Sequence, residues 1–308
     1  MSMASKSFPS ILSILTFALI MEGGLGAEDS PPEKPEAVPA DSAGIIDSLL
    51  DESRDQDGMD SSGTVCEDTT PHQHHRVLPN QAFGAGEHFE YVVKYGFITA
   101  GSAYLDIDTV VPIRGHQAYR ITSRAKSSSF FSKFYNVNDR AESYVDVEGI
   151  YPVWFEKHLR EGKYKSDRWV RFDHTRHIAV SSKGDTLRIP PFVQDVLSVM
   201  YYVRTQPLEV GKSVVLDNYA DGKNYPLEVK VLRKERKKVE AGEFNCIVVE
   251  PLIQEGAGIF VHKGSVTVWL TDDKNRLPIY MKSQVILIGS ISAELKKFKL
   301  GNPYQASK

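Results

Sequence analysis

The adjacent carboxylates Asp272 and Asp273 are the residues of this sequence whose type and spacing are most suited to chemistry. Paired carboxyl groups can share general acid and base work or hold a divalent cation, which would suit a hydrolase or a sugar-active enzyme. The stretch Asp272–Asn275 is also typical of a hairpin turn, because Asp and Asn side chains satisfy nearby backbone groups. We favour the turn and keep the hydrolase as the alternative.

Histidine and cysteine offer weaker candidates. His72, His74 and His75 cluster, but no Cys or Asp at a defined spacing completes a metal-binding pattern. Cys66 and Cys246 are far apart in the chain, and spacing alone leaves open whether they pair. The sequence has no glycine-rich phosphate loop, no GxSxG and no HExxH motif. We therefore predict no catalytic residue, no metal and no cofactor, and lean away from an enzyme.

The first residues are typical of a secretory signal peptide. Lys6 precedes an apolar run at residues 8–21, and small residues follow at 23–27. This pattern predicts a signal peptide over residues 1–27, with cleavage after Ala27 and export to the periplasm or cell envelope. No second long apolar segment follows, so we expect no transmembrane segment after cleavage. We expect no nucleic-acid partner for an exported chain.

Residues 28–80 are predicted to form a disordered acidic linker. Residues 28–79 hold 13 acidic and three basic residues, a net charge of −10, against −3 for the whole chain. Because residues 1–27 carry no net charge, residues 80–308 carry +7. A basic folded part suits anionic lipid head groups or acidic polymers, although the acidic segment would also aid solubility alone. Residues 41–52 have helical apolar spacing. They are a candidate docking segment for an envelope partner, or a transient helix too short to persist alone.

Residues 81–300 are predicted to form a single β-rich domain, followed by a flexible tail at 301–308. Short connections between strands favour antiparallel meanders, and some dozen strands cannot stay flat. The predicted fold class is therefore mainly β, a large curved antiparallel sheet, barrel or half-barrel, with one central helix packed on it. The predicted strands are 87–95, 103–110, 117–125, 139–146, 151–159, 165–173, 176–181, 213–217, 225–232, 244–251, 265–270, 277–283 and 288–298, and 127–135 is a loop or short helical turn.

The one predicted helix covers residues 192–204. Asp195 suits its first turn and Arg204 its last. Its apolar stripe must be buried, and the concave face of the sheet is the available partner. The stripe consists of Val193, Val196, Leu197, Met200 and Tyr201.

The basic run Arg233–Lys238 is expected to connect two strands. It has two interpretations: a patch for anionic lipid or polysaccharide, or a solvated hairpin tip or charged edge that prevents aggregation. We favour the second.

Aromatic side chains are candidates to line an apolar cavity for a lipid-like ligand. An ordinary aromatic core would use the same residue types. Arg204 would face a ligand head group or a buried acid, or simply cap the helix. The predicted ligand-binding residues are Phe130, Phe131, Trp154, Met200, Tyr201 and Arg204.

Six segments carry a distinctive pattern: 86–103, 139–146, 151–155, 195–211, where Tyr-Tyr-Val-Arg precedes a Pro-Leu-x-x-Gly turn, 239–244 and 269–278. In this order they resemble an exported bacterial family catalogued as domain of unknown function 3108. The resemblance covers about residues 83–298 and omits the predicted signal peptide and linker. It implies a periplasmic or envelope location and a mostly β domain, and it implies no established activity and no catalytic residues.

These observations together favour a non-enzymatic cell-envelope protein that binds a lipid or other apolar ligand in a curved β domain. One alternative is an envelope hydrolase or sugar-active enzyme that uses Asp272 and Asp273. Another is an envelope scaffold that docks a partner protein through the linker.

Overall fold

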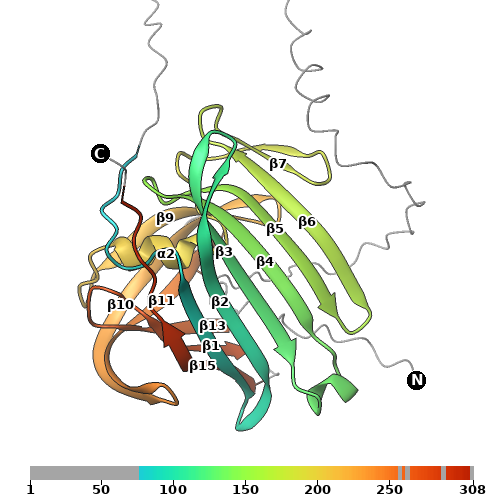
Figure 1. Ribbon diagram of the computed structural model, residues 1–308, viewed down its shortest axis with the longest axis vertical. Helices are drawn as coiled ribbons and strands as arrows, with labels where there is room; N and C mark the ends of the chain where they lie inside the picture. Colours follow the sequence, from blue (N-terminus) through green and yellow to red (C-terminus); the bar gives the residue numbers. More distant parts are fainter. Residues whose placement is uncertain (1–75, 256–258, 261–263, 286–288, 306–308) are drawn as a thin grey trace, which may run out of the picture. The chain divides into compact units, whose positions relative to one another are not determined.

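The computed structural model describes residues 76–255, 259–260, 264–285 and 289–305. Within these ranges the chain forms one antiparallel sheet and one α-helix (Figure 1). The first strands are β1 (Glu87–Tyr95), β2 (Ile98–Ile113), β3 (His116–Ser127), β4 (Asn138–Asp146), β5 (Pro152–Glu161), β6 (Tyr164–Asp173), β7 (Ile178–Ser181) and β8 (Thr186–Arg188), with the 3-10 helix η2 (Phe131–Lys133) after β3. After the helix α2 (Ser198–Thr205) come β9 (Ser213–Ala220), β10 (Lys223–Val239), β11 (Gly242–Glu255), β12 (Ile259–Phe260), β13 (Gly264–Thr271), β14 (Pro278–Val285) and β15 (Gly289–Lys299).

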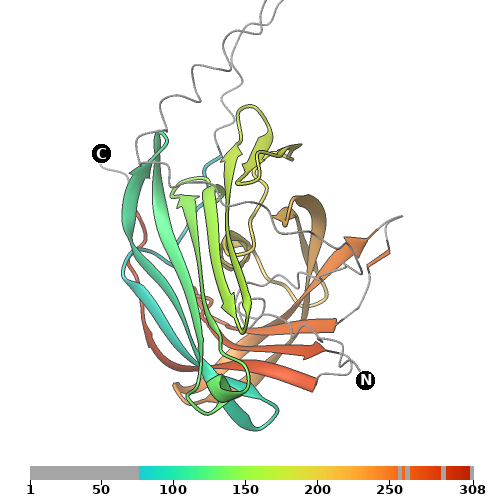
Figure 2. The same ribbon diagram turned by 90° about the vertical axis from the view of Figure 1, so that its right-hand side faces the viewer.

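The sheet joins two meanders at its centre. Its strand order is β8-β7-β6-β5-β4-β3-β2-β1-β15-β14-β13-β11-β10-β9, and β12 pairs with β11 off this path. The two meanders meet where β1 pairs with β15, in a register that places Tyr91 opposite Leu295. Fourteen twisted strands cannot remain flat, and the two halves run in clearly different directions (Figures 1 and 2). The predicted class, a mainly β curved antiparallel sheet with one helix packed on it, is confirmed.

The chain between β8 and α2 covers the free edge of β9. The Gln194 N–H donates to the Asp217 carbonyl at 2.9 Å, and the Tyr219 N–H donates to the Gln194 carbonyl at 2.7 Å. The Asn224 side chain donates to the Arg188 carbonyl at 2.6 Å. In the described residues β8 and β9 are thus separate sheet edges, and the segment after β8 satisfies backbone groups that β9 would otherwise leave open.

Helix α2 is shorter than predicted, since it begins at Ser198 instead of residue 192. Phe192 has a positive φ of 56°, which is incompatible with a right-handed helix at that point. Asp195 lies before the helix, where its Oδ1 accepts the N–H groups of Leu197 and Ser198 at 2.8 and 2.7 Å. These bonds satisfy donors that a helix start leaves open. Asp195 therefore fixes where α2 begins.

We expected the basic run Arg233–Lys238 to connect two strands, and this prediction is wrong. The run lies inside β10. It pairs with β11 residue by residue up to the turn at Val239. Four of its five basic side chains contact a partner on β10, on the neighbouring strand β11 or beyond it, which makes so polar a stretch compatible with a ladder. The partners are Glu235 for Arg233, Asp272 for Lys234, Glu243 for Arg236 and the Tyr280 ring for Lys237.

Residues beyond both predicted domain bounds contact the folded part of the chain. Arg76 donates to the carbonyls of Gly149 and Ile150 at 2.7 and 2.9 Å. At the other end Asn302 bridges to Ala85. The folded part therefore begins before residue 81 and continues past residue 300. In the described residues, no helix is long and apolar enough to cross a membrane.

Several sequence-based predictions concern residues outside the described ranges. These are the signal peptide at 1–27, the linker up to residue 75 with its candidate docking segment at 41–52, the histidine cluster and Cys66. Each stays a prediction.

Candidate functional site

Arg204 and Glu87 form a buried ion pair that joins α2 to the central strand β1. Arg204 donates from Nη1 to Glu87 Oε1 at 2.8 Å and from Nη2 to Oε2 at 2.7 Å. The two side chains are 0% and 1% exposed. Of the three partners that the sequence left open for Arg204, the structure therefore shows a buried acid.

Further hydrogen bonds of Arg204 join two more segments to the helix. Nη2 donates to the Ala82 carbonyl at 3.0 Å and to the Asn275 carbonyl at 3.0 Å. Burial opposes the charge of Arg204, but the adjacent Glu87 carboxylate outweighs it and raises the pKa of Arg204. The guanidinium also lies over the Phe83 and Tyr201 rings. These contacts compensate the positive charge of Arg204, which would otherwise be very costly to bury.

From the sequence we did not identify which acid would pair with Arg204, although one signal was present. Glu87 has the same strand parity as Phe89, Tyr91 and Val93, which are all buried. Alternation therefore places the Glu87 carboxylate on the core face of β1. A charged residue at such a position needs an opposite charge.

A second buried polar contact lies at the start of the helix. Ser143 of β4 donates to Asp195 Oδ2 at 2.5 Å. Burial raises the pKa of Asp195 to about 6, although Ser143 and the N–H groups of Ser198 and Leu197 lower it. Together with the Arg204–Glu87 pair, this contact fixes both ends of α2 to the sheet.

Small side chains occupy neighbouring core positions on β2, β3 and β4. Ala103 is opposite Ala125, and Ser123 is opposite Ala141. All four are at most 1% exposed. We call Ala103, Ser123, Ala125 and Ala141 the small-residue floor.

Two hydroxyl groups at the core face have no hydrogen-bond partner within the described part of the chain. One is Ser123 Oγ in the floor and the other is the Tyr201 hydroxyl on α2, and both residues are fully buried. The Tyr201 ring packs edge-on against Phe83 at 4.8 Å between ring centres. Burial raises the pKa of Tyr201 well above its ordinary value, so its hydroxyl stays protonated and able to donate.

Helix α2 is small relative to the sheet that surrounds it. Its eight residues extend about 12 Å at 1.5 Å per residue. The fourteen strands of the sheet path, about 4.8 Å apart, extend roughly 60 Å across the hydrogen-bonding direction. The helix can therefore cover only part of the inner face.

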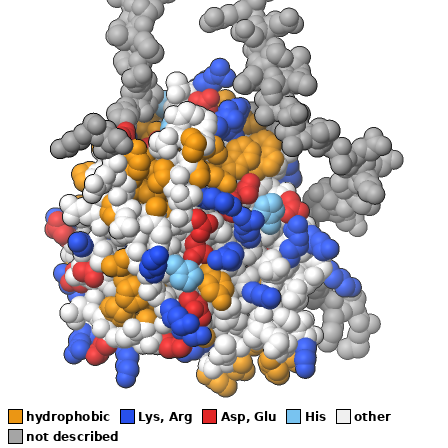
Figure 3. Space-filling view, viewed as in Figure 1, with side chains coloured by type: hydrophobic (Ala, Val, Ile, Leu, Met, Phe, Trp, Pro, Cys, Tyr) orange, Lys and Arg blue, Asp and Glu red, His pale blue; other side chains and the backbone are white. Residues whose placement is uncertain are grey.

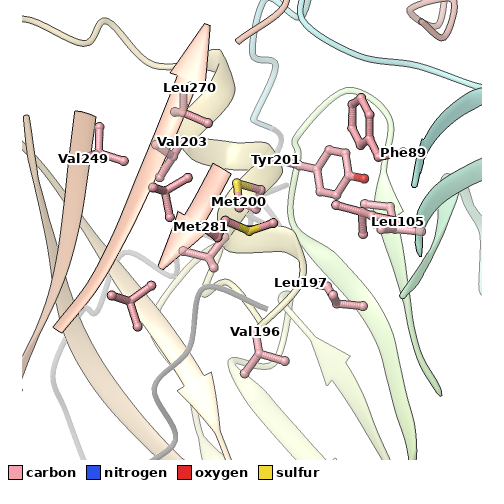
Figure 4. Packing of buried hydrophobic residues seen from close by; sticks show 14 of the residues in the cluster. Phe89, Leu105, Val196, Leu197, Met200, Tyr201, Val203, Val249, Leu270 and Met281 are labelled. Atoms are coloured by element: carbon pink, nitrogen blue, oxygen red, sulfur yellow. The ribbon is translucent and has the colours of Figure 1, made fainter. Parts of the chain in front are cut away.

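The structure brings three of the six predicted ligand-binding residues together. Met200, Tyr201 and Arg204 are buried on α2, and Figure 4 shows Met200 next to Met281 of β14. Trp154 is on the other face of β5 from the buried Phe155, because side chains alternate along a strand.

The other predicted residues lie away from the helix. Trp154 stacks on Trp169 at 4.9 Å between ring centres. Phe130 and Phe131 belong to the connection around η2, where Phe130 is exposed and Phe131 is half-buried. The six residues therefore do not form one cluster.

Asp272 and Asp273 make contacts typical of a hairpin turn. Asp273 Oδ1 accepts the N–H groups of Asn275 and Arg276 at 2.8 and 3.1 Å, and the Thr271 hydroxyl at 2.9 Å. Asp272 pairs with Lys234 at 2.7 Å. Both carboxylates thus have local partners at the turn between β13 and β14.

Other groups capable of chemistry are isolated. In the residues that the structure describes, no group of three or more His, Cys, Asp and Glu side chains has the arrangement of a metal site. Cys246 is free and buried, and burial raises the pKa of its thiol to about 11. A thiol with so high a pKa is a poor nucleophile at neutral pH.

The fold and these contacts define a mainly β domain whose single described α-helix is fixed at both ends inside a curved sheet. Over residues 90–296 the sequence matches the model of a family described as a protein of unknown function, DUF3108. The chain belongs to this family, as the resemblance in its motifs indicated. No curated protein matches the chain.

Three solved structures are similar to this chain at low sequence identity. A β-barrel-like protein of the domain of unknown function DUF1849 from Brucella abortus is 10% identical, with a TM-score of 0.49 over 74% of this chain and 100% of that chain. A Bacteroides fragilis protein described as exported, with a YmcC-like fold, is 11% identical, with a TM-score of 0.27 over 73% and 99%. A Parabacteroides distasonis protein described as a lipoprotein is 10% identical, with a TM-score of 0.34 over 73% and 100%.

Proposed function

We propose that this protein is a non-enzymatic protein of the cell envelope that holds a lipid or other apolar molecule against the small-residue floor. The observation that carries the proposal is the combination of this floor with a helix too short to cover the sheet. Protein cores are packed to nearly crystalline density. The four floor side chains are buried in the structure, so a molecule held there would take the place of the groups that now cover them.

The two unpartnered hydroxyl groups define the chemistry of the bound molecule. A buried hydroxyl without a partner destabilises the protein by about 1–3 kcal/mol. Ser123 and Tyr201 each offer a donor at the core face. A molecule with an apolar body and one or two acceptor oxygens, such as an acyl ester, would satisfy both hydroxyl groups.

An envelope location for this function rests on the sequence. Residues 1–27 have the charge, apolar run and small residues of a signal peptide. An exported carrier or sensor of apolar molecules would operate where free lipid is otherwise insoluble.

The proposal is tested by native mass spectrometry and organic extraction of the purified protein. We expect a bound apolar molecule that extraction removes. In the Ala141→Leu variant the added side chain should take the place of the ligand, so the bound molecule should be lost, while the melting temperature should stay close to that of the extracted, ligand-free wild type.

Ala293→Leu is the matched control, because Ala293 is buried opposite Met281 beside the helix. Overpacking there should destabilise the protein by about 1–3 kcal/mol. If Ala141→Leu is equally destabilising and no molecule is extracted, the floor is part of a solid core and the proposal is wrong.

A further inference from the structure

Three strand connections meet at one end of the sheet. They are the β1–β2 turn, the β3–β4 connection that contains η2, and the β5–β6 turn (lower part of Figure 1). The Ser128 N–H donates to the Ala100 carbonyl at 2.7 Å, and the Gly162 N–H donates to the Asn136 carbonyl at 2.7 Å. These bonds hold the three connections side by side.

Large apolar side chains are exposed on all three connections. Phe97 is 94% exposed, Phe134 is 76% and Phe130 is 59%, and Ile98 and Tyr164 are also exposed. Figure 3 shows apolar and basic side chains together at this lower end of the molecule. We call Phe97, Ile98, Phe130, Phe134 and Tyr164 the apolar rim. Apolar groups gathered at loop ends in this way are typical of an interaction surface.

The charged residues among the rim are almost all basic. Residues 95–99, 126–136 and 161–165 contain the exposed side chains Lys126, Lys133, Lys163 and Lys165. The one acid in these ranges, Glu161, is buried. Just beyond them, the exposed acid Asp167 is paired with Arg160 at 2.7 Å. The rim therefore presents apolar groups within a positive field.

We propose that the apolar rim docks on the surface of an anionic lipid bilayer. Aromatic side chains partition into the interface between head groups and acyl chains, and lysines beside them gain from the negative surface potential. This inference concerns the outer end of the sheet and does not depend on a molecule bound at the small-residue floor. None of the variants used below alters that floor.

A second copy of the chain fits this surface less well. In a two-fold symmetric interface the same patch meets itself. The four lysines of one copy would then face the four of the other, and like charges at close range repel. Lipid phosphates supply the opposite charge that the rim requires.

Vesicle sedimentation tests the proposal with the purified protein. The probes are vesicles of phosphatidylcholine with about 30% phosphatidylglycerol and vesicles of phosphatidylcholine alone. We expect binding to the anionic vesicles, weakened by raised salt. Phe97→Ser with Phe134→Ser should reduce the partition coefficient at least tenfold. Each lysine near the surface contributes about 1 kcal/mol, or roughly fivefold, so Lys126→Glu, Lys133→Glu and Lys163→Glu together should abolish binding.

Matched controls change the same chemistry elsewhere on the surface. Val210→Ser with Val215→Ser removes exposed apolar groups, and Lys183→Glu, Lys230→Glu and Lys238→Glu together change the net charge equally. Both control variants should retain binding within about twofold. Absence of binding, equal binding to neutral vesicles, or equal losses in controls and rim variants would overturn the proposal. So would a dimer in sedimentation velocity that the Phe97 and Phe134 substitutions dissociate.

Discussion

Arg204 of α2 and Glu87 of β1 form a two-pronged ion pair in which both side chains are excluded from solvent. The residues are 117 positions apart, so the pair links the helix to the strand at the centre of the sheet. Arg204 also binds the carbonyls of Ala82 and Asn275. The Arg204 guanidinium therefore holds together α2, β1, the segment at Ala82 and the turn at Asn275.

Breaking this pair should strongly destabilise the fold. Arg204→Met leaves the Glu87 carboxylate buried without its cation, and we expect a loss of about 3–5 kcal/mol. Glu87→Gln should give a loss of similar size, because it strands the guanidinium. Denaturant unfolding of both variants measures these changes.

The double variant Arg204→Met with Glu87→Gln provides the control, since it leaves no unpaired charge. We expect it to recover at least 1 kcal/mol relative to the sum of the single variants. Additive single and double losses would show that the two residues do not act as a pair.

The pH dependence of stability should have two opposing contributions. Burial lowers the pKa of His174 from 6.5 to about 4, so between these values the unfolded chain binds a proton that the folded protein does not. Stability therefore falls as the pH falls through this window. Burial raises the pKa of Asp195 from 3.8 to about 6, so the folded protein holds the extra proton there and stability rises as the pH falls. Each contribution reaches roughly 3 kcal/mol at full extent.

Substitution separates the two contributions. His174→Gln should remove the acid-side loss, so that stability at pH 4.5 relative to pH 7 increases by about 2 kcal/mol over the wild type. Asp195→Asn should change the same difference in the opposite direction. The measurement is urea unfolding at both pH values, and a shift of the same sign in both variants would contradict the assignment.

The alternation of apolar residues was enough to predict most strands, but it could not place the start of α2. The Pro190-Pro191 pair and the stripe beginning at Val193 favour a helix from residue 192. The structure keeps Gln194 extended, because its backbone pairs with β9 at Asp217 and Tyr219. This tertiary contact outweighs local propensity, and a single sequence contains no sign of it.

The candidate site was harder to predict than the fold. Strand parity indicates that Ser123 and Ala141 face the core, but their pairing depends on the register of β3 with β4. A shift of one residue in this register would turn one strand over relative to the other and move one of the two side chains to the other face. The same limit applies to the apolar rim. Phe97 and Phe130 become neighbours in one patch only because antiparallel hairpins return to the same end of the sheet.

The carboxylates at the β13–β14 turn should support structure rather than catalysis. Asp273→Ala removes an acceptor for two backbone N–H groups and should destabilise the protein by about 1–2 kcal/mol. Asp273→Asn keeps a carbonyl oxygen for these bonds and should change stability by less than about 0.5 kcal/mol. Thermal unfolding measures both.

A hydrolase that uses this pair would behave differently. The variant Asp272→Asn with Asp273→Asn would remain folded and lose activity on a panel of ester and glycoside substrates. We expect the double variant to show the same activity as the wild type on these substrates. Its ligand content, measured by native mass spectrometry, should also match that of the wild type.

Two buried serines on neighbouring strands should respond to alanine substitution with opposite signs. The Ser143 hydroxyl donates to Asp195, so Ser143→Ala should destabilise the protein by about 1–2 kcal/mol. The Ser123 hydroxyl has no partner among the described residues. In the extracted, ligand-free protein, Ser123→Ala should therefore be neutral or stabilise it by about 1 kcal/mol.

The presence of ligand should reverse the benefit of Ser123→Ala. If an acceptor oxygen of the bound molecule accepts the Ser123 hydroxyl, the variant retains less ligand, and its melting temperature rises less when an apolar ligand is added back. Ser143→Ala is the control, because it should lower stability equally with and without ligand. A Ser123→Ala variant that is destabilised in the ligand-free protein would mean that this hydroxyl has a structural partner and that the floor is not a binding surface.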